Sequence, residues 1–269
     1  KEQIFKQTAL MVAVREGHTE TVALLLEEGA NPNAATRIGT VPEFRLPCKG
    51  TGCGSEGVGI NRGGLPDHGK RDGQKGGMTP LLYAARDGLI AEVQLLLESG
   101  ADFEQVEAND ISPLLMAIIN GHMDIANLLM EKGANINVSD FWGRTPLWAA
   151  VEFRNMDMNT KEEDDPVTNH VDRGAVYLVL SRLLNLGADV NFQTRELPPN
   201  GRWLYVLNDV SWVDYTGQTA FLRAAFSGDV EVMNLLLEYD ADPNLATWAG
   251  TTPLMAAAGV GWVVDQTYT

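Results

Sequence analysis

Residues 112–137 read SPLLMAIINGHMDIANLLMEKGANIN, and this stretch decides the fold because imperfect copies of it recur along the chain. A small hydroxyl residue opens each copy, at Thr8, Thr79, Ser112, Thr145, Thr219 and Thr252. Three of the five spacings between these openers are 33 residues. A fixed period of this size is typical of repeat architectures. We therefore expect residues 1–269 to form one elongated array, with units starting near 8, 79, 112, 145, 219 and 252.

Each copy can be interpreted as two short helices. The opening Ser or Thr supplies an N-cap oxygen, and the Pro that often follows suits a first helical turn. Glycine ends the first helix because it tolerates the left-handed conformation, and it does so at Gly17, Gly88, Gly121 and Gly228. A second helix then carries a Leu-Leu face, such as Leu95 and Leu96 or Leu128 and Leu129. The pattern predicts an all-α solenoid of helix-turn-helix units.

The period of 33, the Thr-Pro-Leu opening, the paired alanines and the Gly-Ala-Asp/Asn-x-Asn ending together resemble the ankyrin repeat. The resemblance implies a hairpin before each unit, with an Asp-x-x-Gly turn such as Asp140–Gly143 or Asp214–Gly217. Asp110 and Lys6 occupy the turn's glycine position in two other hairpins. The histidine of the family's Thr-Pro-Leu-His is replaced throughout, by Met11, Leu82, Leu115, Trp148, Leu222 and Met255. We expect apolar packing at that position.

Long inserts interrupt the array at about 34–77, 156–172 and 192–213, and we expect them to gather on the hairpin side. The first is rich in glycine, which disfavours helix and strand. The last unit is incomplete, since the sequence after Trp262 does not supply a Leu-Leu helix. Because solenoids need a polar cap, we expect either further chain or a partner to cover this end, and we favour further chain. The glycine-rich insert and the Ala-Ala-Gly-Val-Gly-Trp262 ending resemble a bacterial branch of ankyrin proteins, which implies a weak preference for a periplasmic or extracellular location.

Both cysteines, Cys48 and Cys53, lie in the glycine-rich insert. A disulfide between them and two free thiols are equally compatible with the sequence. A metal site with His68 is a third alternative, although Cys-x4-Cys lacks the close spacing and the four ligands of structural zinc sites. No cofactor is expected.

The formal charge of -16 argues against duplex nucleic acid and anionic membrane surfaces as partners. No apolar run reaches the roughly 20 residues that span a bilayer, so no membrane insertion is expected. The acidic run 157–165 does not follow the twelve-residue calcium loop and has the composition of a solvated loop. His18 and His122 occupy the Gly-His slot of the repeat, where the resemblance implies a structural role. No motif of a hydrolase or a phosphate-binding loop occurs, so the chain is not expected to be an enzyme.

The resemblance implies that a protein partner binds a concave surface made of hairpin tips and first-helix ends. The positions that correspond are Arg15, Glu16, Arg86, Asp87, Ile119, Asn120, Phe141, Trp142, Arg144, Glu152, Phe153, Tyr215, Gln218, Phe226 and Trp248. The first half of this set is charged and the second half is aromatic, and Trp, Tyr and Arg are favoured in binding hot spots. Two alternatives stay open for the aromatics, contact with a partner and packing beneath the inserts. Self-assembly by end-to-end stacking is a further alternative, as is an enzyme or metal site built by the inserts.

Overall fold

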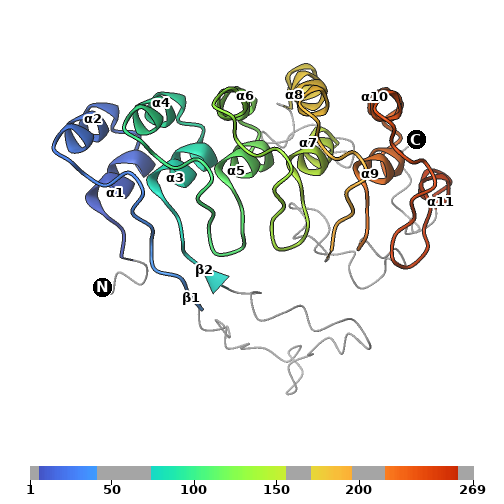
Figure 1. Ribbon diagram of the computed structural model, residues 1–269, viewed down its shortest axis with the longest axis horizontal. Helices are drawn as coiled ribbons and strands as arrows, with labels where there is room; N and C mark the ends of the chain where they lie inside the picture. Colours follow the sequence, from blue (N-terminus) through green and yellow to red (C-terminus); the bar gives the residue numbers. More distant parts are fainter. Residues whose placement is uncertain (1–5, 41–73, 156–170, 196–215, 260–269) are drawn as a thin grey trace, which may run out of the picture.

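The computed structural model describes residues 6–40, 74–155, 171–195 and 216–259. These residues form two parallel rows of helices with loops extending from one side (Figure 1). The first row contains α1 (Ala9–Arg15), α3 (Pro80–Asp87), α5 (Pro113–Ile119), α7 (Pro146–Arg154), α9 (Ala220–Phe226) and α11 (Pro253–Ala257). The second row contains α2 (Thr19–Glu27), α4 (Ile90–Glu98), α6 (Met123–Glu131), α8 (Arg173–Asn185) and α10 (Val230–Glu238). The predicted all-α repeat solenoid is confirmed.

The first helices begin at the residues that the sequence predicts. The hydroxyl oxygens of Thr8, Thr79, Ser112, Thr145, Thr219 and Thr252 each accept a hydrogen bond from the backbone N–H three residues later. Such a bond satisfies one of the amides that a helix leaves unpaired at its start. Local capping therefore fixes the register of every unit.

At three turns, a residue other than glycine occupies the glycine position of the repeat and still adopts the left-handed conformation. Lys6 and Asp110 have φ angles of 48° and 64°, as expected from their place in the hairpins. Asp240 stands where the other units have the glycine of Gly-Ala and has a φ angle of 63°. Aspartate tolerates this region better than most residues. The repeat therefore dictates the backbone conformation even where its glycine is lost.

Five hairpins lie between the six units, and we call them hairpins A to E in chain order. They are closed by the backbone pairs Thr36 and Met78, Glu107 and Ile111, Asp140 and Arg144, Thr194 and Gln218, and Thr247 and Thr251. In hairpin C, Asp140 bonds Arg144 and Gly143 through its backbone, and its carboxylate accepts from the Arg144 N–H at 2.8 Å. Thr36 closes hairpin A in the same way, with Met78 and Gly77 as its partners.

Thr194 closes hairpin D onto Gln218 and Gly217. The expectation that Asp214 starts this turn is therefore wrong, and Asp214 itself lies outside the described residues. In hairpins A and D the inserted sequence replaces the two tip residues of a normal turn. The first and third inserts therefore leave the array from hairpin tips.

Hairpin A has an extended base, because β1 (Gly39–Thr40) pairs antiparallel with β2 (Gln74–Lys75). This is the only strand pairing among the described residues.

The second insert has a different position, since it joins α7 to α8 inside the fourth unit. The core is one continuous apolar cluster that runs through the first five units. Five of the six residues that replace the family histidine are buried, and Met255 is the exception.

A ladder of asparagine side chains links the ends of successive second helices. Asn137 donates to the Gly187 carbonyl at 3.1 Å and accepts from the Asp189 N–H at 2.8 Å. Asn33 and Asn191 make the equivalent pair of bonds to the next unit. Glu104 occupies the same position in the second unit but only accepts, from the Asn135 N–H. A carboxylate has no donor for the Gly133 carbonyl, so the ladder lacks one bond at this junction.

Replacing Glu104 with asparagine is expected to raise the free energy of unfolding by about 0.5–1.5 kcal/mol, the usual net value of one hydrogen bond. The new side chain would donate to the Gly133 carbonyl and still accept from Asn135. Urea denaturation measures the change. Glu98→Gln is the matched control, because it removes an exposed negative charge at the end of α4 without adding a ladder bond. An equal gain in both variants would attribute the effect to charge alone.

Candidate functional site

The hairpin tips form a continuous hydrogen-bonded row, which we call the tip row. The Ala108 N–H donates to the Gly76 carbonyl at 3.1 Å, and the Phe141 N–H donates to the Asn109 carbonyl at 2.9 Å. The row continues from Arg195 to Trp142 at 2.9 Å. It ends with a bond of 3.1 Å from the Trp248 N–H to the Thr216 carbonyl. These bonds join hairpins A to E, so the tips hold fixed positions relative to one another.

Aromatic side chains lie on the tips of hairpins C and E. The rings of Phe141 and Trp142 meet edge to face with centroids 5.6 Å apart, and both residues are half-buried. Trp248 lies directly on the backbone of Gly217, where an added Cβ would come within 2.8 Å of its ring. The remainder of this indole is open, since 62% of Trp248 is exposed. Trp248 is therefore a largely exposed aromatic surface that rests on the backbone of hairpin D.

Two residues expected at the tips are buried, so the sequence-based assignment is wrong for them. The Arg144 guanidinium bonds the Asp140 carboxylate through Nε at 2.7 Å and lies 5.3 Å from the Trp142 ring. Gln218 is also buried, at the base of hairpin D rather than at its tip. Arg144 holds its hairpin through its side chain, and Gln218 holds its hairpin through its backbone bonds to Thr194.

Burial also raises the pKa values of the two carboxyl groups inside hairpins B and C. Burial raises the pKa of Asp140 above its ordinary value, although Arg144 opposes the shift. Glu107 takes the same repeat position in hairpin B, and burial raises the pKa of its carboxyl against the opposing N–H donors of Asn109 and Ile111. These two carboxylates stabilise the turns beneath the tips and do not reach the surface.

Charged pairs occupy the ends of the first two helices in the first row. Arg15 pairs with Glu16 at 2.8 Å, and Arg86 pairs with Asp87 at 2.7 Å. The hydrogen bond to Asp87 raises the pKa of Arg86, whose guanidinium also lies 5.0 Å from the Tyr83 ring. All four charged residues retain solvent exposure. This end of the surface therefore presents both positive and negative charges.

The helix-end residues of the middle units are less accessible. Asn120 is exposed and Ile119 is half-buried, while Phe153 packs onto Gly121 of the preceding unit. Glu152 is paired with Arg223 of α9, and Phe226 is half-buried. We therefore define the recognition surface by the exposed and half-buried members of the expected set. They are Arg15, Glu16, Arg86, Asp87, Ile119, Asn120, Phe141, Trp142, Glu152, Phe153, Phe226 and Trp248.

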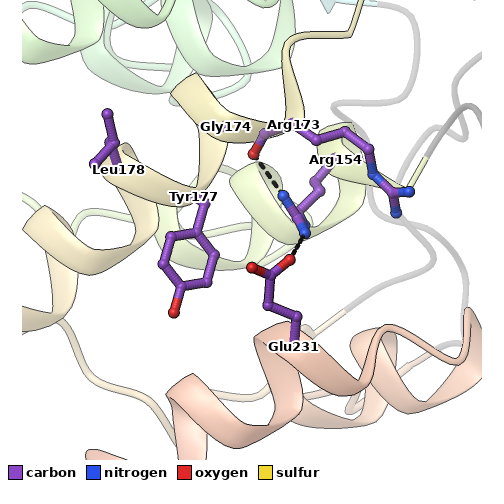
Figure 2. Close-up of a pocket in the computed structure, with 6 residues that line it drawn as sticks. All are labelled: Arg154, Arg173, Gly174, Tyr177, Leu178 and Glu231. Carbon is purple, nitrogen blue, oxygen red and sulfur yellow. Dashed lines mark hydrogen bonds and ion pairs between the residues drawn. The ribbon is translucent and has the colours of Figure 1, made fainter.

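Arg154 joins the fourth and fifth units, and the sequence did not identify it. Its Nε bonds Asp229 at 2.9 Å, and its two terminal nitrogens bond the Arg173 carbonyl and Glu231. Figure 2 shows the Arg154 side chain between α8 and α10, at one side of an open cleft of about 620 Å³. Tyr177 and Leu178 form the apolar wall of this cleft. Because each of the three guanidinium nitrogens makes a hydrogen bond, Arg154 connects α7, α8 and α10.

The repeat and its hairpins agree with comparisons to known protein families. A model of three ankyrin repeats matches residues 81–160, and a single-repeat model matches residues 5–37 and 216–248. The chain belongs to the ankyrin-repeat family. Ankyrin repeats are generally non-catalytic modules for protein–protein interaction.

Two nematode proteins are similar to this ankyrin-repeat chain. An ankyrin repeat and KH domain-containing protein, mask-1, from Caenorhabditis elegans is 29% identical over 97% of the chain. An L-asparaginase from Dirofilaria immitis is 28% identical over 66% of the chain. The chain spans 9% of the first protein and 29% of the second. Neither relative is bacterial, so the bacterial branch and the exported location stay predictions.

Several predicted sites lie outside the described residues. They are the disulfide or thiols of Cys48 and Cys53, the alternative metal ligand His68, the acidic run 157–165, and Tyr215. In the described part of the chain, no cluster of three His, Cys, Asp or Glu side chains has the geometry to hold a metal ion. Within the same ranges, no helix has the length and apolarity to cross a membrane. His122 contacts the Arg86 carbonyl at 3.0 Å between units, which supports its structural assignment.

The role of Arg154 has one signal in the sequence. Arg154 occupies the repeat position at which Gly17, Gly88, Gly121 and Gly228 end the first helix of other units. Without a glycine, α7 continues to Arg154 and extends its guanidinium toward α10. An arginine in a glycine position therefore marks a changed junction, although its partners lie 75 and 77 residues away.

Proposed function

We propose that this chain is a non-catalytic recognition module that binds a protein partner through the recognition surface. The family supports the general role, because ankyrin repeats are generally protein–protein interaction modules. The observation that carries the proposal is Trp248, a largely exposed indole fixed on Gly217 at the end of the tip row. A rigid exposed tryptophan buries a large area on binding at little cost in entropy.

The two halves of the surface suit different parts of a partner. Phe141, Trp142 and Trp248 supply apolar anchors at the tips of hairpins C and E. The pairs Arg15–Glu16 and Arg86–Asp87 supply polar contacts at the other end of the array. Charges at a solvated rim select partners and orient them, while buried aromatics provide most of the affinity. The proposed partner is therefore a protein with an apolar patch beside a polar region of mixed charge.

Replacing Trp248 with alanine is expected to weaken partner binding by about tenfold or more, since hot-spot truncations cost about 2 kcal/mol or more. The measurement is affinity capture with the wild-type chain, followed by titration of each captured protein with the variant. Thermal unfolding should change little, because most of the indole is exposed.

Val230→Ala is the matched control, because Val230 is equally exposed but lies at the start of α10 in the other helix row. Unchanged affinity of every captured protein for Trp248→Ala would refute the recognition surface. Equal losses in both variants would place the binding elsewhere on the array.

A further inference from the structure

The cleft beside Arg154 exists because α8 is longer than the other second helices. All five second helices end at the same position of the repeat, two residues before Gly187 in the case of α8. Four of them contain nine residues, whereas α8 contains 13. The additional residues 173–176 therefore form one extra turn at the start of α8. Because α10 begins at the position of Tyr177, it has no turn opposite this extension.

The cleft lies where the extra turn lacks a neighbour. It has a volume of about 620 Å³ and is lined by Arg154, Arg173, Gly174, Tyr177, Leu178 and Glu231. This volume lies within the range of about 300–1,000 Å³ that ligand sites usually have. None of the lining residues belongs to the recognition surface. The cleft is therefore a separate candidate for binding.

Leu178 is an unusual residue for its position in the repeat. The corresponding residues of the other second helices are Glu20, Ala91, Asp124 and Glu231, and all of them are exposed. Only α8 places a large apolar side chain there, and Leu178 is 68% exposed. Tyr177 lies next to it, and the Arg154 guanidinium lies 5.7 Å from the centre of the Tyr177 ring. The two side chains give the cleft an apolar wall that packing within the array does not require.

Arg173 supplies a hydrogen-bond donor that is not used. Its Nε atom is buried and has no hydrogen-bond partner among the described residues. Its terminal nitrogen lies 4.0 Å from Asp229, which already bonds Arg154 at 2.9 Å. A buried N–H group without an acceptor is unfavourable. A ligand that brings an acceptor to Arg173 would remove this cost.

The charges around the cleft favour an uncharged ligand. Arg154 and Arg173 balance the carboxylates of Asp229 and Glu231. The remaining carboxylate, on Asp172, caps α8 by accepting from the Ala175 N–H at 2.9 Å. A ligand of either sign would therefore meet a like charge close to its partner. Peptide carbonyls are strong acceptors that carry no net charge.

We propose that the cleft binds a short uncharged segment of a protein partner. A large apolar side chain of this segment packs against Leu178 and Tyr177, and one of its backbone carbonyls accepts from the Nε of Arg173. Figure 2 shows that Leu178 and the Arg173 guanidinium lie on opposite sides of Tyr177 and Arg154, so an extended segment can reach both. The cleft is open to solvent, which lets the partner chain continue beyond it at both ends.

Selection of displayed random heptapeptides on the purified chain tests this proposal, followed by titration of each enriched peptide. Enriched peptides should combine a large apolar residue with a net charge near zero. Leu178→Ala and Arg173→Met should each weaken binding about tenfold, because the first removes the apolar contact and the second removes the donor. Affinity should change less than about twofold between low and high salt, since the bound segment is uncharged.

Two variants serve as controls. Leu186→Ala truncates another exposed leucine, at the far end of α8, and should bind the peptides like the wild type. Trp248→Ala changes the recognition surface and should leave peptide binding unaffected, so a failure of one proposal is distinguishable from a failure of the other. Thermal unfolding of Leu178→Ala and Arg173→Met should match the wild type, because both side chains are exposed in part.

Three results would overturn the assignment of the cleft. Enrichment of no peptide would show that the cleft does not accept a peptide segment. Peptides that lose affinity with Trp248→Ala but not with Leu178→Ala would bind the recognition surface instead. Affinity that falls steeply with added salt would indicate a charged ligand and contradict the balance of charges.

Discussion

Arg154→Ala is expected to lower the free energy of unfolding by about 3–5 kcal/mol, the usual cost of removing one partner from a buried ion pair. Arg154 and Asp229 are both almost completely buried, and their side chains meet at 2.9 Å. Without this guanidinium, the buried Asp229 carboxylate would keep only Arg173 as a cation, at 4.0 Å and partly solvated. Urea denaturation at neutral pH measures the loss.

Two further variants separate the buried pair from a general charge effect. Arg182 pairs with Glu131 at 3.1 Å, but both side chains are partly solvated. Arg182→Ala should therefore cost less than about 1 kcal/mol. Adding Asp229→Asn to Arg154→Ala should recover part of the loss, because asparagine still caps α10 and carries no charge. Similar costs for Arg154→Ala and Arg182→Ala would contradict the assignment.

Most of the fold is encoded by local signals, and the sequence therefore predicts it. Each hydroxyl opener caps a helix within three residues, and each glycine ends one within the same unit. The substitutions at Asp110 and Lys6 did not obscure the register, because the surrounding apolar pattern defines the turn. Signals that act over a few residues can be recognised without knowing the tertiary structure.

The hairpins with inserts depend on distant residues, which explains the wrong assignments there. Thr194 and Gln218 are 24 residues apart in the chain, yet they close one turn. Asp214 offered a closer match to the family turn, so the sequence favoured it. The exposure of a tip residue likewise depends on its partner, as the buried pair of Arg144 and Asp140 shows. Position in the repeat predicts the backbone of the site better than it predicts which side chains are accessible.

Leu114→Ala is expected to lower the free energy of unfolding by about 2–5 kcal/mol, as for other leucines truncated in well-packed cores. Leu114 is only 1% exposed and lies in α5 of the third unit, with packed units on both sides. In a solenoid each unit is stabilised mainly by its neighbours. A cavity in the third unit therefore weakens the coupling between the two halves of the array, and chemical unfolding should become less cooperative.

The repeat supplies a control at the same position. Leu254→Ala removes the same atoms from the same place in a unit, but Leu254 is almost fully exposed. Its cost should stay within about 0.5 kcal/mol, as for most surface substitutions. Equal costs for both variants would mean that Leu254 is covered within its own chain.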